Sequence, residues 1–359
     1  MIPRSTLQTF FTWLLSIGLS LPCFFQNLPA QGNVYGTVKG TVIDDSTNTP
    51  LPLTNVFIAN STIGTVADLE GRFLMRGVPL GSHQIIASII GYQQQWISLR
   101  VTDTTQYVLT FRLKTQNVQM APVEIKGTDP VEWKEQLLQF KSMFFGSTSN
   151  AAQSSLLNPE VLDFSYDEKR DEFTATACAP LIIINRALGY RLRYHLKYFK
   201  KTSVLSQFYG VAQFEPLPHE NADEMIHWKL NRRETYKGSR RHFFAALFQK
   251  NLEQEGFTIT SITKPRRQIS ATDRIGANLD PESVVSEGVS IHEKRFSFQG
   301  VVQVIYGGLL SGRASSIELT QNAVTFFRNG EVADPLELVI DGFWATQRVA
   351  EFLPNDYEP

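Results

Sequence analysis

Short runs of β-forming residues alternate with clusters of Gly, Pro, Asn and Asp between residues 36 and 114. The turn residues Asp68-Leu69-Glu70-Gly71, for example, separate one apolar run from the next. In residues 107–113 a large apolar side chain recurs at every second position, which gives a strand one buried face and one wet face. Roughly eighty residues with this spacing leave room for about seven strands, so they predict a small two-sheet sandwich.

The order of these turns resembles that of the carboxypeptidase-like regulatory domain, whose fold is a prealbumin-like β-sandwich. The same module stands at the N-terminus of TonB-dependent receptors. Because it is an accessory module, the resemblance implies no catalytic residues in this region. It covers residues 36–114 and rests on a series of motifs: Gly40-Thr41-Val42-Ile43-Asp44-Asp45, Pro50-Leu51-Pro52, Gly64-Thr65-Val66-Ala67-Asp68-Leu69-Glu70-Gly71-Arg72-Phe73, Gly77-Val78-Pro79-Leu80-Gly81 and Gly91-Tyr92.

The first thirty residues are typical of a secretory signal peptide. Arg4 supplies a positive start, residues 10–21 are apolar, and Leu28-Pro29-Ala30 offers a cleavage site before Gln31. The apolar run is shorter than the ~20 residues that span a bilayer, which disfavours an uncleaved anchor. A lipid attached at Cys23 is the other alternative, although Leu21-Pro22 is a poor context for it. We therefore expect an exported protein of the periplasm or outer membrane, with no membrane span after cleavage.

Residues 115–128 are polar and predict a linker, and residues 129–359 then predict a second, α+β domain that is rich in strands. Asp129-Pro130 opens a helix in which apolar residues recur at helical spacing until Gly146. From Val161 onward the pattern is mostly that of β-strands. The chain as a whole is therefore expected to be mainly β with some α: an N-terminal seven-stranded prealbumin-like sandwich followed by this domain.

From Trp133 onward the chain also resembles the region that follows the same module in a group of secreted proteins of Gram-negative bacteria. The resemblance implies no particular activity. It rests on three segments: Asn185-Arg186-Ala187-Leu188-Gly189-Tyr190, Tyr236-Lys237-Gly238-Ser239-Arg240-Arg241-His242-Phe243 and Leu353-Pro354-Asn355-Asp356-Tyr357.

A basic cluster in the second domain is the candidate site for an anion or a partner. Ser239 is placed to cap a helix that begins at Arg240 and Arg241, where the positive end of the helix dipole disfavours cations. Such a concentration of charge favours a phosphate or carboxylate at the helix N-terminus. The alternative is internal pairing with Asp223, Glu224 or Glu234. The candidate residues are Arg232, Arg233, Lys237, Ser239, Arg240, Arg241 and His242.

Two further features have plain structural interpretations. Arg191, Arg193, His195 and Lys197 recur at every second position of one strand and predict a solvated basic face. Cys178 follows a run of small residues and is the only cysteine after the signal peptide, so we expect a buried, unreactive thiol without a disulfide partner.

No catalytic motif is evident. None of the six histidines has a glutamate three residues later, as a zinc carboxypeptidase would require. The chain also lacks a Gly-x-Ser-x-Gly elbow, a phosphate-binding glycine loop and a Cys-x-x-Cys pair. We therefore expect no metal, no cofactor and no enzymatic activity.

The sequence thus favours a non-enzymatic envelope protein that binds another envelope protein, a glycan or an anionic lipid. Its formal net charge of −1 provides no general attraction for nucleic acid. The alternative is an envelope hydrolase whose site is assembled from dispersed residues of the second domain. A deep cavity that gathers two or more carboxylates or histidines would favour the hydrolase. An exposed basic cluster on a shallow surface would favour the binding protein.

Overall fold

The computed structural model describes residues 35–116, 130–203, 205–262 and 276–359, which belong to one compact unit. The expected signal peptide and most of the expected linker lie outside the described residues. Most of the described secondary structure is strand, with five α-helices between the sheets, so the mainly β fold predicted from the sequence is confirmed. A search of the described residues finds no helix that is both long and apolar enough to cross a membrane.

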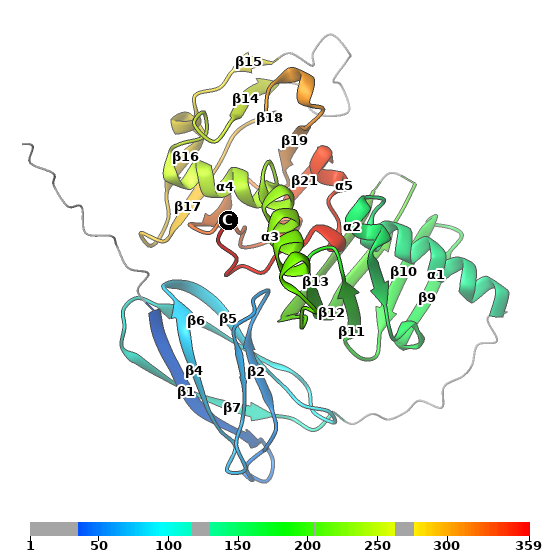
Figure 1. Cartoon of the computed structure of the whole chain (residues 1–359), viewed down its shortest axis with the longest axis vertical. Helices are drawn as coiled ribbons and strands as arrows, with labels where there is room; N and C mark the ends of the chain where they lie inside the picture. The colour runs from blue at the N-terminus through cyan, green and yellow to red at the C-terminus, as the bar shows by residue number, and fades with distance from the viewer. Residues whose placement is uncertain (1–34, 117–129, 204, 263–275) are drawn as a thin grey trace, which may run out of the picture. The chain divides into compact units, whose positions relative to one another are not determined.

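Seven strands form the predicted sandwich at the start of the described chain, coloured blue to cyan in Figure 1. They make two sheets, with the orders β4-β1-β7 and β3-β2-β5-β6. Within these sheets only β1 and β7 pair in parallel. Val38, Val56 and Phe111 are fully buried between the sheets. The strands are β1 (Tyr35–Asp44), β2 (Asn55–Ile58), β3 (Gly64–Val66), β4 (Arg72–Pro79), β5 (Gly81–Ser88), β6 (Gln95–Val101) and β7 (Gln106–Leu113).

Two of the motifs read from the sequence have clear structural roles in the sandwich. The backbone N–H of Gly71 donates to the Asp68 carbonyl at 3.0 Å, and that of Arg72 donates to Asp68 Oδ1 at 2.7 Å, which closes the predicted turn. The Tyr92 hydroxyl donates to Asp44 Oδ2 at 2.9 Å. Hydrogen bonds from Ser46, Thr47 and Tyr92 hold the pKa of Asp44 well below its usual range, so this carboxylate fastens the end of β1 in its charged form.

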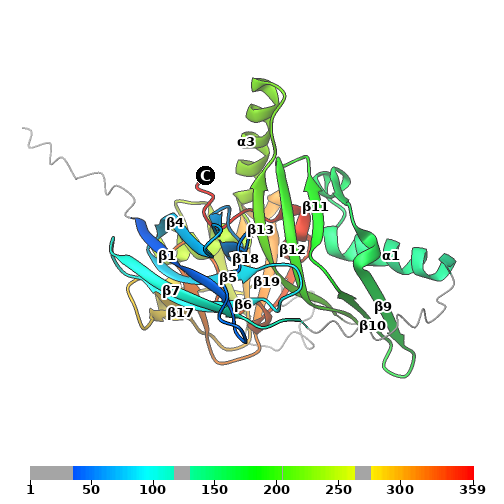
Figure 2. The same cartoon turned by 90° about the horizontal axis from the view of Figure 1, so that it is seen from below.

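A six-stranded sheet follows the sandwich, with the order β8-β11-β12-β10-β9 and β13 paired with β12. The long β12–β13 hairpin contains a register shift between Leu196 and Tyr198, next to Gly210, which marks a β-bulge. Figure 2 shows β12 and β13 of this hairpin side by side. The elements are α1 (Pro130–Phe145), α2 (Ser149–Ala152), β8 (Ser154–Leu156), a 3-10 turn (Pro159–Val161), β9 (Leu162–Asp167), β10 (Glu172–Ala177), β11 (Leu181–Asn185), β12 (Tyr190–Lys201) and β13 (Ser206–Pro216).

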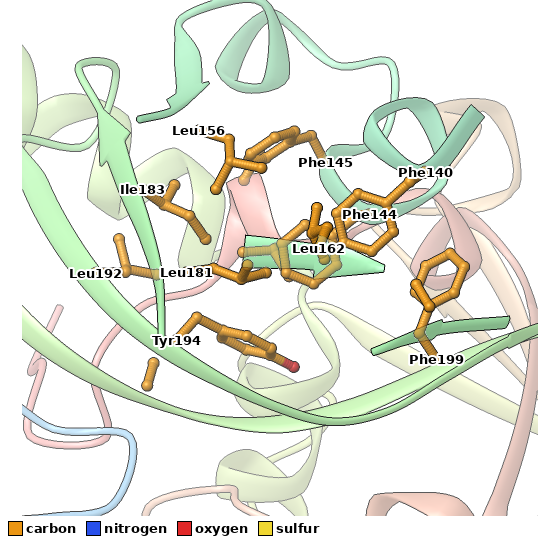
Figure 3. Packing of buried hydrophobic residues seen from close by; sticks show 14 of the residues in the cluster. Phe140, Phe144, Phe145, Leu156, Leu162, Leu181, Ile183, Leu192, Tyr194 and Phe199 are labelled. Atoms are coloured by element: carbon orange, nitrogen blue, oxygen red, sulfur yellow. The ribbon is translucent and has the colours of Figure 1, made fainter. Parts of the chain in front are cut away.

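Helix α1 packs its aromatic stripe on this sheet, as the helical spacing predicts. Phe140 and Phe144 stack with their ring centroids 4.8 Å apart, and Phe144 meets the edge of Tyr194 on β12 at 5.2 Å. Figure 3 shows these rings above Leu181 and Tyr194 of the sheet. The helix ends at Gly146, whose φ of +87° is a conformation that glycine adopts at little cost.

The expectation for Cys178 was wrong, because its thiol is exposed. The residue lies just beyond the end of β10, in the connection to β11. Side chains in a strand alternate between faces, so Cys178 continues the outward side of Thr176, whereas Ala175 is buried. Small neighbours therefore did not indicate burial here.

Two helices follow the six-stranded sheet: α3 (Ala222–Tyr236), which was not predicted from the sequence, and α4 (Arg240–Gln249), which was. Trp228 anchors α3 by donating from its indole N–H to the Arg186 carbonyl at 2.8 Å. The ring lies over Gly189, where a Cβ atom would come within 2.2 Å of it. Gly189 also has a φ of +66°, so the turn between β11 and β12 requires glycine for both reasons.

Two smaller sheets complete the chain, with the orders β15-β14-β18-β19-β21 and β16-β17-β20. Helix α4 covers them with Phe243 and Phe244, which are fully buried against Phe296 and Phe326. The elements are β14 (Phe257–Ile262), β15 (Ala277–Asn278), a 3-10 turn (Pro281–Val284), β16 (Val285–Glu287), β17 (Glu293–Phe296), β18 (Val301–Tyr306), a 3-10 turn (Leu309–Ser311), β19 (Ala314–Leu319), β20 (Val324–Phe327), a 3-10 turn (Pro335–Glu337), β21 (Leu338–Gly342), α5 (Phe343–Thr346) and a 3-10 turn (Val349–Glu351).

The outer face of β2 and β5 packs against β12 and β13 of the six-stranded sheet. Phe57, Ile86 and Val211 are fully buried together, apart from the main core of the sandwich. Backbone groups also join the two regions: the Asn60 N–H donates to the Ala212 carbonyl at 2.7 Å. The sandwich is therefore fastened to the six-stranded sheet by apolar burial and by backbone hydrogen bonds.

This contact corrects the expectation of a solvated basic face on β12. Arg191 and Arg193 are exposed and pair with Glu215, but His195 is buried and stacks on Phe57 with ring centroids 5.9 Å apart. The Lys197 ammonium lies 4.7 Å from the centre of the Trp96 ring. Alternation along the strand correctly placed these four residues on one face, but it could not show that the sandwich covers part of that face.

Candidate functional site

The seven candidate residues do not form one patch. Arg232 donates to the carbonyls of Leu188 and Gly189 at 2.7 and 3.2 Å, and its guanidinium lies 4.0 Å from the centre of the Tyr190 ring. Its charge is thus used to dock α3 on the turn between β11 and β12. Arg233, the next residue of the helix, is exposed.

Lys237 and His242 are held by neighbouring groups. Lys237 pairs with Glu234 at 3.7 Å. His242 is buried, and its Nδ1 accepts from the Gly238 N–H at 3.0 Å, so Nε2 carries the proton and donates to Glu255 Oε2 at 3.0 Å. Burial lowers the pKa of His242, against the opposing effect of Glu255. The neutral imidazole therefore links the turn before α4 to the segment that connects α4 to β14.

Arg241 binds the end of the chain. Its guanidinium donates to the carbonyls of Asn329, Pro354, Asn355 and Tyr357 at 3.0, 2.6, 2.7 and 2.9 Å. These acceptors are backbone groups, whereas the sequence suggested Asp or Glu partners for the cluster. Arg241 is therefore the anchor of the final segment, although it also lines the cavity described next.

Three of the candidates, Ser239, Arg240 and Arg241, come together at the wall of a cavity of about 280 Å³. Ser239 caps α4 as predicted, because its Oγ accepts from the His242 N–H at 3.1 Å. The N–H groups of Arg240 and Arg241 have no acceptor within a helix that begins there. The remaining walls are mostly apolar and include Phe208, Leu338, Ile340, Trp344, Phe352 and Leu353.

Several polar side chains at this cavity have no hydrogen-bond or ion-pair partner in the described part of the chain, among them Tyr194, Ser206, Arg240 and Arg348. Tyr194 is only 1% exposed, and burial raises the pKa of its phenol, so the hydroxyl stays neutral. The Ser206 Oγ is buried without a partner. A buried hydroxyl without a partner costs folding free energy, so the cavity contains unused hydrogen-bonding capacity.

Arg240 and Arg348 add positive charge to these unused hydrogen-bonding groups of the cavity. Burial lowers the pKa of the Arg240 guanidinium, and the negative charge of Glu331 opposes the shift. Burial likewise lowers the pKa of Arg348, whose guanidinium lies 5.8 Å from the centre of the Phe208 ring. Both arginines are partly buried, and neither guanidinium makes an ionic hydrogen bond with the described residues, which a bound anion would supply.

Two carboxylates also line the cavity, Glu331 and Glu351. Glu351 accepts from Asn150 Nδ2 at 2.7 Å and from the hydroxyls of Thr148 and Thr235. Its oxygens are thereby fixed by α2 and α3. Glu331 accepts no side-chain hydrogen bond from the described residues and lies in the field of Arg240.

The sequence pointed to only part of this site. A run of cations at a capped helix start drew attention to Ser239, Arg240 and Arg241. Tyr194, Ser206 and Arg348 come from β12, β13 and the segment after α5, and no local motif marks any of them. Separately, the described residues hold no group of three or more His, Cys, Asp or Glu side chains placed to bind a metal ion.

Comparison with known structures gives similarities that cover a small part of the chain. BcpA, the major pilin subunit of Bacillus cereus, is 13% identical over 23% of this chain and 31% of its own, with a TM-score of 0.21. The group B streptococcus pilus 2b backbone protein is 15% identical over 23% of this chain and 42% of its own, with a TM-score of 0.19. Klebsiella pneumoniae 5-hydroxyisourate hydrolase is 17% identical over 23% of this chain and 91% of its own, also at 0.19.

The chain spans less than half of either pilus protein, and these scores carry no argument about activity. A search of curated protein sequences returned no match. The family model described as a CarboxypepD_reg-like domain matches residues 38–125, which agrees with the turn motifs and with the seven-stranded sandwich. The first part of this chain is therefore a carboxypeptidase-regulatory-like β-sandwich domain.

Proposed function

We propose that this chain is an exported, non-enzymatic binding protein of the cell envelope. In this proposal the sandwich is a scaffold, and the cavity at the start of α4 binds an anionic group of the partner. The observation that carries it is the set of polar groups at the cavity that have no partner among the described residues, above all the partly buried Arg240 and Arg348. Arg4 and the apolar run at residues 10–21 support export.

Arg240 favours a binding role over a structural one. It combines a desolvated charge, a position in the first turn of α4 and the absence of an ion pair among the described residues. Each of these costs folding free energy. A residue that costs stability at a cavity wall is typical of a site that a ligand completes.

The scaffold role rests on the contact between the sandwich and the second domain. Phe57 and Ile86 are buried against β13, and Asn55 Nδ2 donates to Gln213 Oε1 at 2.5 Å. The N–H of Asn355, beside the cavity, donates to the Asn60 carbonyl at 2.6 Å. The sandwich therefore supports the same final segment that closes one side of the cavity.

Isothermal titration calorimetry of the mature protein with small anions tests the proposal. Benzoate, phenyl phosphate and sulfate cover a carboxylate, a phosphate and a bare anion. We expect at least one of them to bind, and Arg240→Gln and Arg348→Gln each to weaken that binding by about tenfold or more. Arg233→Gln, an exposed arginine outside the cavity, is the matched control. The proposal would be refuted if none of the three anions bound, or if all variants bound them equally.

A hydrolase is the second candidate, because the cavity gathers two carboxylates, the arrangement expected from the sequence for a hydrolase. Glu351 is held by three donors, which leaves Glu331 as the group able to act as a base. Incubation of the protein with small aryl esters and amides distinguishes the two functions. Turnover that Glu331→Gln abolishes, with anion binding retained, would establish the hydrolase. Binding without turnover supports the binding protein.

A further inference from the structure

The charges, volume and walls of the cavity narrow the class of its ligand. We propose that the cavity binds a monoanionic carboxylic acid with a short apolar body, of about ten non-hydrogen atoms. This inference rests on the proposed function, because it specifies what the same site binds. The sequence suggested a protein, a glycan or an anionic lipid as the partner. The cavity favours a small amphipathic acid over all three of these classes.

The charge balance favours a single negative charge. Three arginines line the cavity against two glutamates, which leaves a surplus of one positive charge. One carboxylate neutralises that surplus. A phosphate monoester carries about −1.5 to −2 at neutral pH, so it would bring excess negative charge close to Glu331.

The donors suit a carboxylate as well. Guanidinium groups bind carboxylates through two parallel hydrogen bonds. Arg240 and Arg348 are both available for this, because neither makes a hydrogen bond or an ion pair with the described residues. The neutral hydroxyl of Tyr194 can donate one further hydrogen bond where an anion needs it.

The volume limits the rest of the ligand. A liquid water molecule occupies about 30 Å³, so about 280 Å³ holds roughly nine water-sized groups. That is the size of a medium-chain or arylalkanoic acid, and it is far smaller than a two-chain lipid. A sugar of similar size would leave its hydroxyls against the apolar walls formed by Leu338, Ile340 and Phe352.

The walls explain why the body of the ligand is apolar. Phe208, Leu338 and Trp344 belong to β13, β21 and α5, so apolar surface from three elements faces one space. The Trp344 indole N–H already donates to the Gly238 carbonyl at 2.7 Å. Its ring therefore offers the ligand an apolar face with no remaining donor.

Calorimetry with four eight- and sixteen-carbon probes tests the inference on the full mature chain. Octanoate has the proposed charge and size, octanol lacks the charge, octyl phosphate has a larger charge, and hexadecanoate has a longer chain. We expect octanoate to bind at least about tenfold more tightly than each of the other three. Arg240→Gln and Arg348→Gln should each remove most of the advantage over octanol, whereas Arg233→Gln should leave it intact.

Each outcome decides the matter. Octanol or octyl phosphate binding as tightly as octanoate, or hexadecanoate binding more tightly, would overturn the ligand class. Phenyl phosphate or sulfate binding that depends on Arg240, with no binding of octanoate or benzoate, would overturn this inference while the proposed function stands. If no anion binds, both fail. Circular dichroism and thermal melting of each variant show whether it is folded, and Arg348→Gln provides a second readout if Arg240→Gln is not.

Discussion

Replacing Arg241 with alanine separates the structural arginine of the basic cluster from the binding one. The change removes four hydrogen bonds from a guanidinium to backbone carbonyls, at 2.6 to 3.0 Å. A hydrogen bond to a charged group contributes about 1.5 to 3 kcal/mol when measured alone. The four share one side chain and their acceptors are partly reachable by water, so their energies do not add in full.

Removing a cation from the first turn of α4 recovers about 0.3 to 1 kcal/mol. We therefore expect a net loss of about 3 kcal/mol in the free energy of unfolding. Urea denaturation at pH 7 measures this loss, with Arg233→Ala as the matched control. Arg241→Lys should recover little of the stability, because an ammonium cannot reproduce the fork of the guanidinium.

Hydrogen exchange provides a local test of the same reasoning. The Asn355 N–H donates to the Asn60 carbonyl, and the Tyr357 N–H donates to the Pro354 carbonyl. Without Arg241 the final segment should open more often, so both amides should exchange faster than in Arg233→Ala. Unchanged unfolding and unchanged exchange in Arg241→Ala would refute the anchoring role.

Three further outcomes are expected. Gly189→Ala should destabilise the protein by about 3 kcal/mol or more, because the φ of Gly189 is +66° and a Cβ would come within 2.2 Å of the Trp228 ring. Urea denaturation measures this loss. Gly77→Ala is the control that isolates the clash, because Gly77 has a similar φ of +71° but open space around it. Burial, together with the charges of Lys197 and Arg193, lowers the pKa of His195 to about 4, so the folded protein favours the neutral ring. The stabilisation from this residue should be complete above about pH 6.5 and should fall as the pH drops towards 4. Urea denaturation at a series of pH values measures this dependence, which His195→Gln should remove. Cys178 should react with a thiol reagent in the native protein as fast as a free thiol, and a reaction that needs denaturant would contradict its exposed position.

The sandwich was predictable because its signal is local. Asp68 and Gly71 indicate a turn within a window of four residues. The alternation that includes Tyr107 and Phe111 indicates a strand within a window of seven. The helix α3 was missed for the opposite reason. Of its fifteen residues only Trp228, Thr235 and Tyr236 are buried, so no apolar stripe marks it. The helix docks through Trp228 on Gly189 and on the Arg186 carbonyl. These contacts lie in a distant turn, so the periodicity of the helix sequence does not indicate them.

The candidate site was predictable only where the chain itself brings residues together. Ser239, Arg240 and Arg241 are consecutive, and the conflict between their charge and the helix dipole is visible in the sequence. Tyr194 and Arg348 are 154 positions apart and meet only through the packing of separate sheets. The different roles of Arg240 and Arg241 could not be read from two identical neighbours. Which of them binds backbone carbonyls depends on where Pro354 and Asn355 lie.

The parallel pairing of β1 with β7 has a consequence for folding of the nascent chain. Asp44 of β1 pairs with Leu113, which follows 69 positions later, so a growing polypeptide holds its first strand long before the neighbour for one of its edges exists. Hairpins such as β5–β6 close early, whereas this last strand must cross the whole module to finish it. During that interval an unpaired edge is available to wrong strands, which is when a holding chaperone would be most useful.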